Sequence, residues 1–222
     1  MTALLARLLA GASPDEIETL CYFTLGELGP GYSGLTPGVG DRTAAAAIAL
    51  AAGVDPAVVE ATARELGDYG DAAVRLAGDP PEGVAGPPTI TDVHRGFMAI
   101  ARASGPGSAD QKVRVLAAML AAATPPERRY LVRLATGEMR LGVGEMTLLD
   151  ALAEAFLGSK AGRPPLEHAY NISSDVGLVA RRLLEEGLAG VSAISVTLHR
   201  PIRPMLTQRV ARLTEIPERI GS

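Results

Sequence analysis

The sequence predicts an all-α fold, a pseudo-two-fold bundle of about ten to twelve helices from an internal duplication, with a short extended C-terminal tail. Three observations lead to this prediction. Alanine and leucine are abundant and aromatic residues make up 4% of the 222 residues, a composition typical of helices. Apolar residues recur at helical spacing between stretches rich in glycine and proline. Short motifs of the first half also return in the same order in the second half.

The duplication rests on four pairs of motifs. The first two pairs share one offset (124 − 13 = 111), and the third has an offset shorter by seven residues (142 − 38 = 104). The pairs are Ser13-Pro14 with Thr124-Pro125, Gly26-Glu27 with Gly137-Glu138, Gly38–Thr43 with Gly142–Thr147, and Asp68-Tyr69-Gly70 with Asp175-Val176-Gly177. Either the duplication places two similar glycine loops on related faces of one body, or it only builds a core.

Glycine and proline separate the elements of the first half. They predict helices near residues 3–10, 14–28, 41–52, 56–66 and 69–77. The Pro- and Gly-rich stretch 78–88 then breaks the pattern. It is expected to link a first copy of about 3–77 to a second copy of about 108–187 within a single domain, 1–222.

The second half is read in the same way. Thr91 is expected to cap a helix at 92–103, after which Ser104–Gly107 forms a loop. Further helices are expected near residues 108–123, 126–136, 145–157, 164–172 and 176–187.

The C-terminal segment 193–206 is expected to be an exit tail. It begins with alternating polarity over 193–198, which predicts a short strand. Pro201 and Pro204 bracket an extended stretch. Arg200 and Arg203 lie beside these prolines, where extended backbone would expose both side chains.

The net charge of −4 argues mildly against a nucleic-acid partner, but the charge is unevenly distributed. Residues 1–110 carry 6 basic and 14 acidic side chains, a net charge of −8. Residues 111–222 carry 15 basic and 11 acidic side chains, a net charge of +4. The second half is therefore either a face for a polyanion or ordinary solvated surface.

Several classes of protein and site are not expected. No uncharged apolar stretch reaches the roughly 18 residues of a membrane span, and the N-terminus lacks a signal-peptide pattern. We therefore expect a soluble, cytoplasmic protein. The lone Cys21 forms no internal disulfide or zinc site and is expected to be a small core residue. His94, His168 and His199 are scattered without ligand spacing, so no metal site is expected. No catalytic acid–base pair is expected either, because the acidic residues fall at helix starts and on polar faces.

Both copies contain a Gly-Val-Gly turn before a helix that starts with an acidic residue and has threonine in third place. Free backbone N–H groups at such a start bind anions, and glycines allow phosphate to approach closely. In the alternative interpretation, Asp41 and Glu145 simply cap these helices.

A third loop, Gly105–Ser108, opens a helix that carries Lys112 one turn in. It is not a Walker motif, but its hydroxyl and ammonium suit a phosphate. Arg140 projects from the second glycine loop and is the more specific candidate. Three arginines on the preceding helix rank below it, because such arginines are more often solvated or paired; these are Arg128, Arg129 and Arg133.

Three motifs in this order resemble the N-terminal DNA-binding domain of ATP-dependent DNA ligases, particularly the archaeal type. They are Gly105-x-Gly107-Ser108 with Lys112, then Gly137–Gly144, then Pro201–Leu206. The resemblance runs from about residue 4 to the C-terminus. It implies an all-helical, pseudo-two-fold body whose loops hold the minor groove of nicked duplex DNA, without sequence specificity, in DNA replication and repair.

The resemblance also implies which residues contact DNA. These are Gly38, Gly40, Arg42, Thr43, Gly107, Ser108, Lys112, Arg140, Gly142, Gly144 and Thr147, with Arg200 and Arg203 in the tail. The first loop departs from the second, because 29–37 is longer and no arginine corresponds to Arg140. Asp68 and Asp175, each before x-Gly, are expected to cap helices instead.

The nucleotidyl lysine of that family, in a Lys-x-Asp-Gly motif, has no match here. Val113-Arg114-Val115 follows Lys112, and Ala161-Gly162-Arg163 follows Lys160. We therefore expect no catalytic residue and no cofactor in this chain, with ATP and Mg²⁺ serving the rest of the parent enzyme. The chain resembles an excised, monomeric domain, clipped at its N-terminus, whose partners are nicked duplex DNA and the adenylation and OB-fold domains. The alternative is a helical repeat scaffold that binds a protein partner.

Overall fold

The computed structural model describes residues 1–78 and 87–203, and the regular secondary structure of this part of the chain is all helical, with no strand. The α-helices are α1 (Thr2–Ala10), α2 (Ile17–Leu25), α3 (Asp41–Ala52), α4 (Pro56–Leu66), α5 (Tyr69–Arg75), α6 (Ile90–Arg102), α7 (Ser108–Ala122), α8 (Pro125–Thr136), α9 (Glu145–Leu157), α10 (Arg163–Ser173) and α11 (Val176–Ser192). Two 3₁₀ turns, η1 (Gly31–Ser33) and η2 (Lys160–Gly162), were not predicted. The all-α prediction is confirmed.

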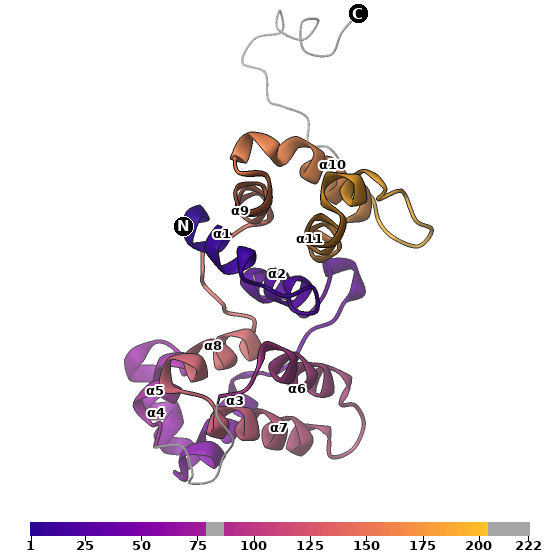
Figure 1. The fold of residues 1–222 in the computed structure, drawn as a ribbon. Coiled ribbons are helices and arrows are strands. Elements are labelled where there is room, and N and C mark those ends of the chain that lie inside the picture. Colours follow the sequence, from indigo (N-terminus) through magenta and orange to yellow (C-terminus); the bar gives the residue numbers. More distant parts are fainter. Residues whose placement is uncertain (79–86, 204–222) are drawn as a thin grey trace, which may run out of the picture.

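The helices form two lobes, each around its own apolar core (Figure 1). The first lobe contains α3 to α8, and Phe97, Ile100 and Leu116 are fully buried in it. The second lobe contains α1, α2 and α9 to α11, around residues such as Leu149 and Leu152. Burial of such side chains stabilises each lobe by roughly 1.5–3 kcal/mol per residue.

The two copies exchange their parts between the lobes. In the first lobe α3 packs on α7 and α5 on α8, and the equivalent pairs in the second lobe are α9 on α1 and α11 on α2. Each lobe therefore takes two helices from one copy and three from the other. The added helix α6 packs on α7. This pairing has the pseudo-two-fold relation that the repeated motifs predict.

Because of this exchange, the charged residues of one half of the sequence do not all lie in one lobe. The second half supplies α7 and α8 to the first lobe and α9 to α11 to the second lobe. The charged residues of the second half that the structure describes are therefore divided between the two lobes.

Several helix starts depart from the predicted positions. Thr89 caps α6 in place of Thr91, because Thr89 and Asp92 bond each other's backbone N–H groups in a capping box. The expected helix 14–28 is shorter, since Gly26 at φ +79° ends it in the left-handed conformation that favours glycine.

The expected strand at 193–198 is wrong. Helix α11 continues to Ser192 through a kink at Gly187, and 194–203 is irregular. A strand needs a partner for its backbone groups, and the helices offer none here. Leu198 is 86% exposed, so the alternation reflects no buried face. Residues 79–86 of the expected linker and 204–206 of the expected tail lie outside the described residues.

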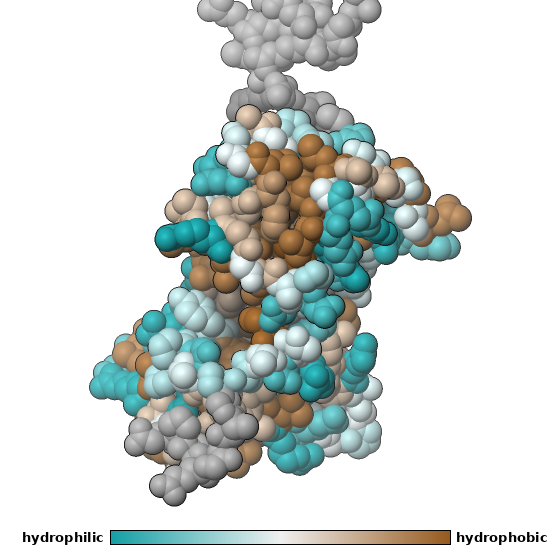
Figure 2. All heavy atoms as spheres, viewed as in Figure 1, coloured by the Kyte–Doolittle hydropathy of each residue, from teal (hydrophilic) through white to brown (hydrophobic). Residues whose placement is uncertain are grey.

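The surface and helix lengths bear on possible partners. Figure 2 shows apolar side chains gathered on one face of the second lobe, between α9 and α11. Leu4 and Leu8 of α1, and Leu188 of α11, are exposed side chains of this lobe.

Within the described ranges no single helix is long and apolar enough to cross a membrane. Helices α3 and α4, bent by 113°, are long and apolar enough only when taken as a pair.

Candidate functional site

The predicted glycine loops are the connections between the lobes. The chain leaves the second lobe after α2 and enters α3, and it leaves the first lobe after α8 and enters α9 (Figure 1). The two connections meet at Gly26, where an added Cβ would lie 3.3 Å from Cβ of Met139. The loops expected to hold an anion therefore lie at the junction of the lobes.

All three predicted loops begin a helix at a glycine, which is extended at Gly40 and Gly144 and left-handed at Gly107. The N-cap residues of α3, α7 and α9 are Gly40, Gly107 and Gly144, and none supplies a side-chain cap. By contrast, Asp55, Asp68, Thr89 and Asp175 cap their helices with side-chain oxygens. First-turn N–H groups that no side chain caps point outward from a helix start and attract anions.

Asp41 and Glu145 are the first residues of α3 and α9 and not their N-caps. Neither side chain is therefore an N-cap, although the Glu145 carboxylate accepts a hydrogen bond from its own backbone N–H. An acidic residue in a first turn still complements the helix dipole. It also lowers the local positive potential that a phosphate would meet.

The first loop and the middle loop are joined by Lys112. Its Nζ donates to the carbonyl oxygens of Pro37 at 2.9 Å and Gly38 at 3.0 Å. A hollow lined by Gly38, Gly40 and Gly137 continues from there to the end of α8. Residues that the sequence predicted separately are therefore adjacent.

Arg140, the main candidate of the second loop, lies over the first lobe. It adopts a positive φ of 52°, and its guanidinium pairs with Asp68 at 3.3 Å and with Glu138. Arg140 and Asp41 line one hollow of about 330 Å³. The first and second loops thus share a surface, although Arg140 is held there by carboxylates.

The second lobe has a hollow lined by Tyr22, Tyr32 and Arg203, and its capping aspartate has different partners from that of the first lobe. Asp175 caps α11 and accepts hydrogen bonds from the hydroxyls of Tyr22 at 2.7 Å and Tyr32 at 3.2 Å. Asp68 in the first lobe caps α5 and accepts from Arg133 instead. Burial, and then the nearby Asp175 carboxylate, raise the pKa of Tyr22 well above its ordinary value. Tyr22 therefore stays neutral as a donor.

The tail arginines fold back on the second lobe. Arg203 pairs with Glu145 at 2.8 Å, lies 4.8 Å over the Tyr170 ring, and donates its backbone N–H to Asn171. Arg200 lies 6.0 Å over the Tyr32 ring. Burial alone would raise the pKa of Glu145, but hydrogen bonds from its own backbone N–H and from Arg203 lower the pKa below its ordinary value.

The remaining predicted contacts sit at the exposed starts of these helices. Arg42 is exposed and Thr43 half-buried at the start of α3, and Thr147 occupies the equivalent place in α9. Ser108 opens α7, and Gly142 takes a positive φ of 65° in the second loop.

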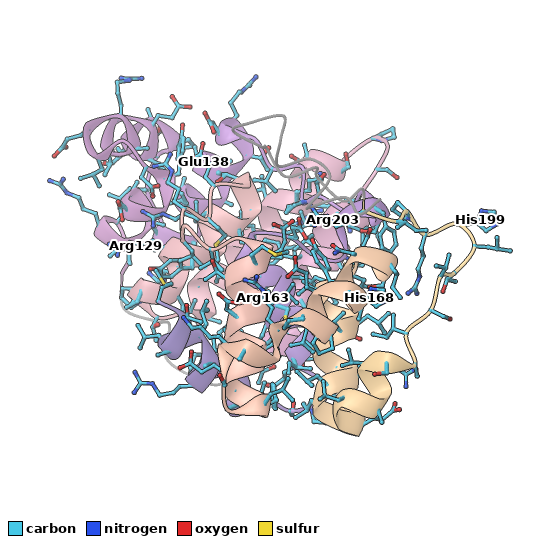
Figure 3. The ribbon with its side chains drawn as sticks, turned by 90° about the horizontal axis from the view of Figure 1, so that it is seen from above. Arg129, Glu138, Arg163, His168, His199 and Arg203 are labelled. Carbon is cyan, nitrogen blue, oxygen red and sulfur yellow. The ribbon has the colours of Figure 1, made fainter. Side chains whose placement is uncertain are left out.

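The three lower-ranked arginines on α8 also have partners within the chain. Arg129 pairs with Asp71, Arg133 pairs with Asp68, and the buried Arg128 donates to the carbonyls of Ala123 and Gly78. From the sequence, these three arginines rank below Arg140 because such arginines are more often solvated or paired, and the structure shows them paired. Figure 3 shows Arg129 and Glu138 toward one side of the molecule and Arg203 nearer its middle.

The histidines are dispersed, as their sequence spacing suggests. His168 lies on α10 and His199 on the loop after α11 (Figure 3). Among the described residues there is no group of three or more His, Cys, Asp or Glu that could hold a metal ion.

Sequence reasoning missed the tyrosines around Asp175. A signal for them exists, because Tyr22 occupies the place of Arg133 at the offset of the first two motif pairs (133 − 22 = 111). Aligning the copies residue by residue therefore pairs Tyr22, which donates to Asp175, with Arg133, which donates to Asp68.

Comparison with known proteins gives one consistent result. A family model described as DNA ligase N terminus matches residues 1–153. The chain is 36% identical over 224 residues to a probable DNA ligase of Aquifex aeolicus, and 38% identical over 230 residues to DNA ligase 2 of Thermofilum pendens. Both alignments cover 100% of this chain and 38% of the relative. DNA ligase 2 of Korarchaeum cryptofilum is 39% identical over 223 residues, which cover 98% of this chain and 37% of that relative.

Proposed function

This chain belongs to the family of DNA ligase N-terminal domains, and we propose that it grips nicked duplex DNA for a parent ligase without catalysing ligation itself. It spans 38% of the length of the first relatives it matches, so the activity and partners of the whole protein are part of the proposal. The parent would be ATP-dependent and would act in replication, repair and recombination, in the cytoplasm.

One observation carries the proposal: the two Gly-Val-Gly loops connect the lobes of a pseudo-two-fold body, and each starts a helix, α3 or α9, without a side-chain cap. The middle loop starts α7 without a side-chain cap and is tied to the first loop by Lys112. Backbone N–H groups hold phosphate without reading bases, as sealing a nick at any sequence requires. They also reconcile binding with a net charge of −4. Duplex DNA is itself pseudo-two-fold, so two related loops suit its two strands.

The residues proposed to face DNA are those that the family resemblance implies, except Lys112, whose ammonium donates to the Pro37 and Gly38 carbonyls. Gly40, Gly107 and Gly144 offer backbone donors, and Arg42, Thr43, Ser108 and Thr147 lie beside them. Gly38 and Gly142 shape the loops with positive φ. Arg140, Arg200 and Arg203 would supply positive charge at the edges, from positions where the structure gives each a partner within the chain.

Chemistry that needs ATP and Mg²⁺ is assigned to the rest of the parent enzyme. Lys112 is engaged with two backbone carbonyls, and neither lysine lies in a nucleotidyl motif. We therefore derive no catalytic step in this chain. Its proposed partners are nicked duplex DNA and the adenylation and OB-fold domains, and it would act as a monomer.

The proposal is tested by fluorescence anisotropy with a labelled nicked duplex across several salt concentrations. Neutralising roughly four to six phosphates gives a log–log slope of about −3.5 to −5.5. Gly40→Ala and Gly144→Ala are informative variants, because both residues have ordinary φ values (−85° and −107°) and open space around them. The fold should tolerate a methyl group there.

We expect each variant to weaken binding on the order of tenfold, because the methyl group keeps phosphate away from the N–H groups. Gly11→Ala is the matched control, since Gly11 has an ordinary φ of −93° and only ordinary contacts at 3.7 Å and beyond. Equal affinities for wild type and all three variants would remove the glycine starts from the proposal.

The exposed apolar face of the second lobe favours the alternative, a scaffold that binds a protein partner. Absence of DNA binding even at low salt would support that reading. Substitutions at Leu4 and Leu8 would then affect partner binding, whereas Gly144→Ala would not.

A further inference from the structure

Lys112 belongs to the second copy, yet its side chain reaches the glycine loop of the first. Its Nζ donates to the carbonyl oxygens of Pro37 and Gly38, at 2.9 and 3.0 Å. These partners lie 75 and 74 residues away along the chain, so the contact is a tertiary tie. Bonds from an ionised donor are roughly twice as strong as neutral ones.

The backbone of the loop is shaped to receive this ammonium. Gly38 adopts a φ of +57°, and a Cβ at this position would lie 3.1 Å from the Lys112 Nζ. Two of the three N–H donors of Lys112 are used by the loop. The lysine is therefore placed to hold backbone, two residues before the uncapped start of α3 at Gly40.

Among the described residues no lysine makes an equivalent tie to the second loop. At the offset of the first motif pairs, the position of Lys112 corresponds to Met1 (112 − 111 = 1). The second loop is shorter, and Arg140 pairs with Asp68 in the same region. A longer loop loses more conformational entropy when it is ordered, so it gains more from a side chain that fixes it.

We propose that Lys112 is a positioning residue that fixes the first glycine loop in its DNA-binding conformation, and that it does not itself neutralise a phosphate. This inference rests on the proposed function. Through Lys112 the first and middle loops act as one surface.

Salt dependence separates positioning from direct contact. Lys112→Met should weaken binding of the nicked duplex on the order of tenfold, because a smaller fraction of molecules holds the competent loop. The log–log slope should stay that of the wild type. Arg42→Ala removes an exposed cation at the same helix start, and its slope should be shallower by about 0.9. Lys160→Met, at an exposed lysine, is the matched control and should change neither quantity.

Hydrogen exchange without DNA tests the tie itself. Amides of residues 38–43 should exchange faster in Lys112→Met than in wild type, and Lys112→Arg, which can still donate to both carbonyls, should restore most of the protection and affinity. Circular dichroism and thermal unfolding of each variant identify any general loss of fold.

Two outcomes would overturn the inference. A slope shallower by about 0.9 with unchanged exchange would make Lys112 a direct phosphate contact. Unchanged affinity and exchange would make the tie irrelevant to the loop. If wild type fails to bind DNA, the proposed function fails, while faster exchange in Lys112→Met would still establish that the lysine fixes the loop.

Discussion

Arg140 illustrates how single residues serve both structure and the proposed function. Its guanidinium pairs with the buried Asp68 while its side chain remains 53% exposed. Asp68 also accepts from the N–H of Asp71 and from Arg133, so it keeps partners when Arg140 is removed. The role of Arg140 in binding can therefore be tested with little effect on the fold.

We expect Arg140→Ala to weaken binding of nicked duplex DNA by about 1–3 kcal/mol, the value of a charge-assisted contact. The free energy of unfolding should fall by less than about 1 kcal/mol, because the pair is half-exposed. Anisotropy titration and urea unfolding measure the two quantities. Arg75→Ala, which breaks the exposed pair with Glu65, is the control that should leave DNA affinity unchanged.

Cys21 is the lone cysteine and is fully buried in the second lobe. Burial, with smaller contributions from Glu18 and Asp175, raises the pKa of its thiol from 9.0 to about 12. We expect no reaction with a thiol reagent at pH 8 in the folded protein and full reaction in denaturant. Rapid stoichiometric labelling of the native chain would show that the second lobe opens readily.

The same pKa predicts a direction for stability. Between pH 9.0 and about 12 the unfolded thiol loses its proton while the folded thiol keeps it. The unfolded state then binds fewer protons, so the free energy of unfolding falls as the pH rises through this window. Cys21→Ala should lose that component of the pH dependence in urea unfolding measured over the same range.

At the scale of helices, two equivalent glycines permit close packing. Gly70 lies two residues after the N-cap of α5, and Gly177 lies two residues after the N-cap of α11. Helix α5 packs on α8, and α11 packs on α2, so each glycine lies against a helix of the other copy. A Cβ would lie 2.6 Å from the Arg129 carbonyl oxygen at Gly70 and 2.4 Å from the Tyr22 ring at Gly177. Neither helix can carry a larger side chain there without moving.

We expect Gly70→Ala and Gly177→Ala to lower the free energy of unfolding by roughly 1–3 kcal/mol, the cost typical of overpacking. Gly70→Ala should cost more, because its neighbour is backbone and cannot turn aside. Thermal or urea unfolding measures both. Gly78→Ala, in open space with an ordinary φ, is the control, and equal stability of all three variants would contradict the close packing.

Helix positions were predictable where glycine or proline marks the ends of the helix. Helices α3 and α4 begin and end as expected, because Gly40, Gly53, Pro56 and Gly67 mark their limits. The strand at 193–198 was mispredicted because alternation alone does not supply a partner strand. The tie between Lys112 and the first loop joins residues far apart in sequence, so no local pattern indicated it.

For the whole molecule, the exchange of helices between lobes has a direct consequence for folding. The first copy supplies α1 and α2 to one lobe and α3 to α5 to the other. Sequence repeats revealed two copies but not which helices pair, because pairing depends on apolar faces that are similar in both. Neither half of the chain contains a complete lobe.

We therefore expect residues 1–78 alone, and residues 87–203 alone, to show little stable helix by circular dichroism. Mixed together, the two fragments should recover helical structure, because each fragment supplies helices that both lobes need. A fragment that unfolds cooperatively by itself would contradict the exchange. The intact chain of 1–203 serves as the reference.

The exchange of helices is the arrangement expected if two identical chains of a symmetric dimer were joined into one. A chain with one copy would have open apolar faces at both ends and would bury them only against a second identical chain, as in a symmetric dimer. Joining the two genes through the segment that now contains α6 would convert that dimer into one polypeptide. The two loops could then diverge independently, one acquiring Arg140 and the other a lysine tie, which an obligate symmetric pair could not do.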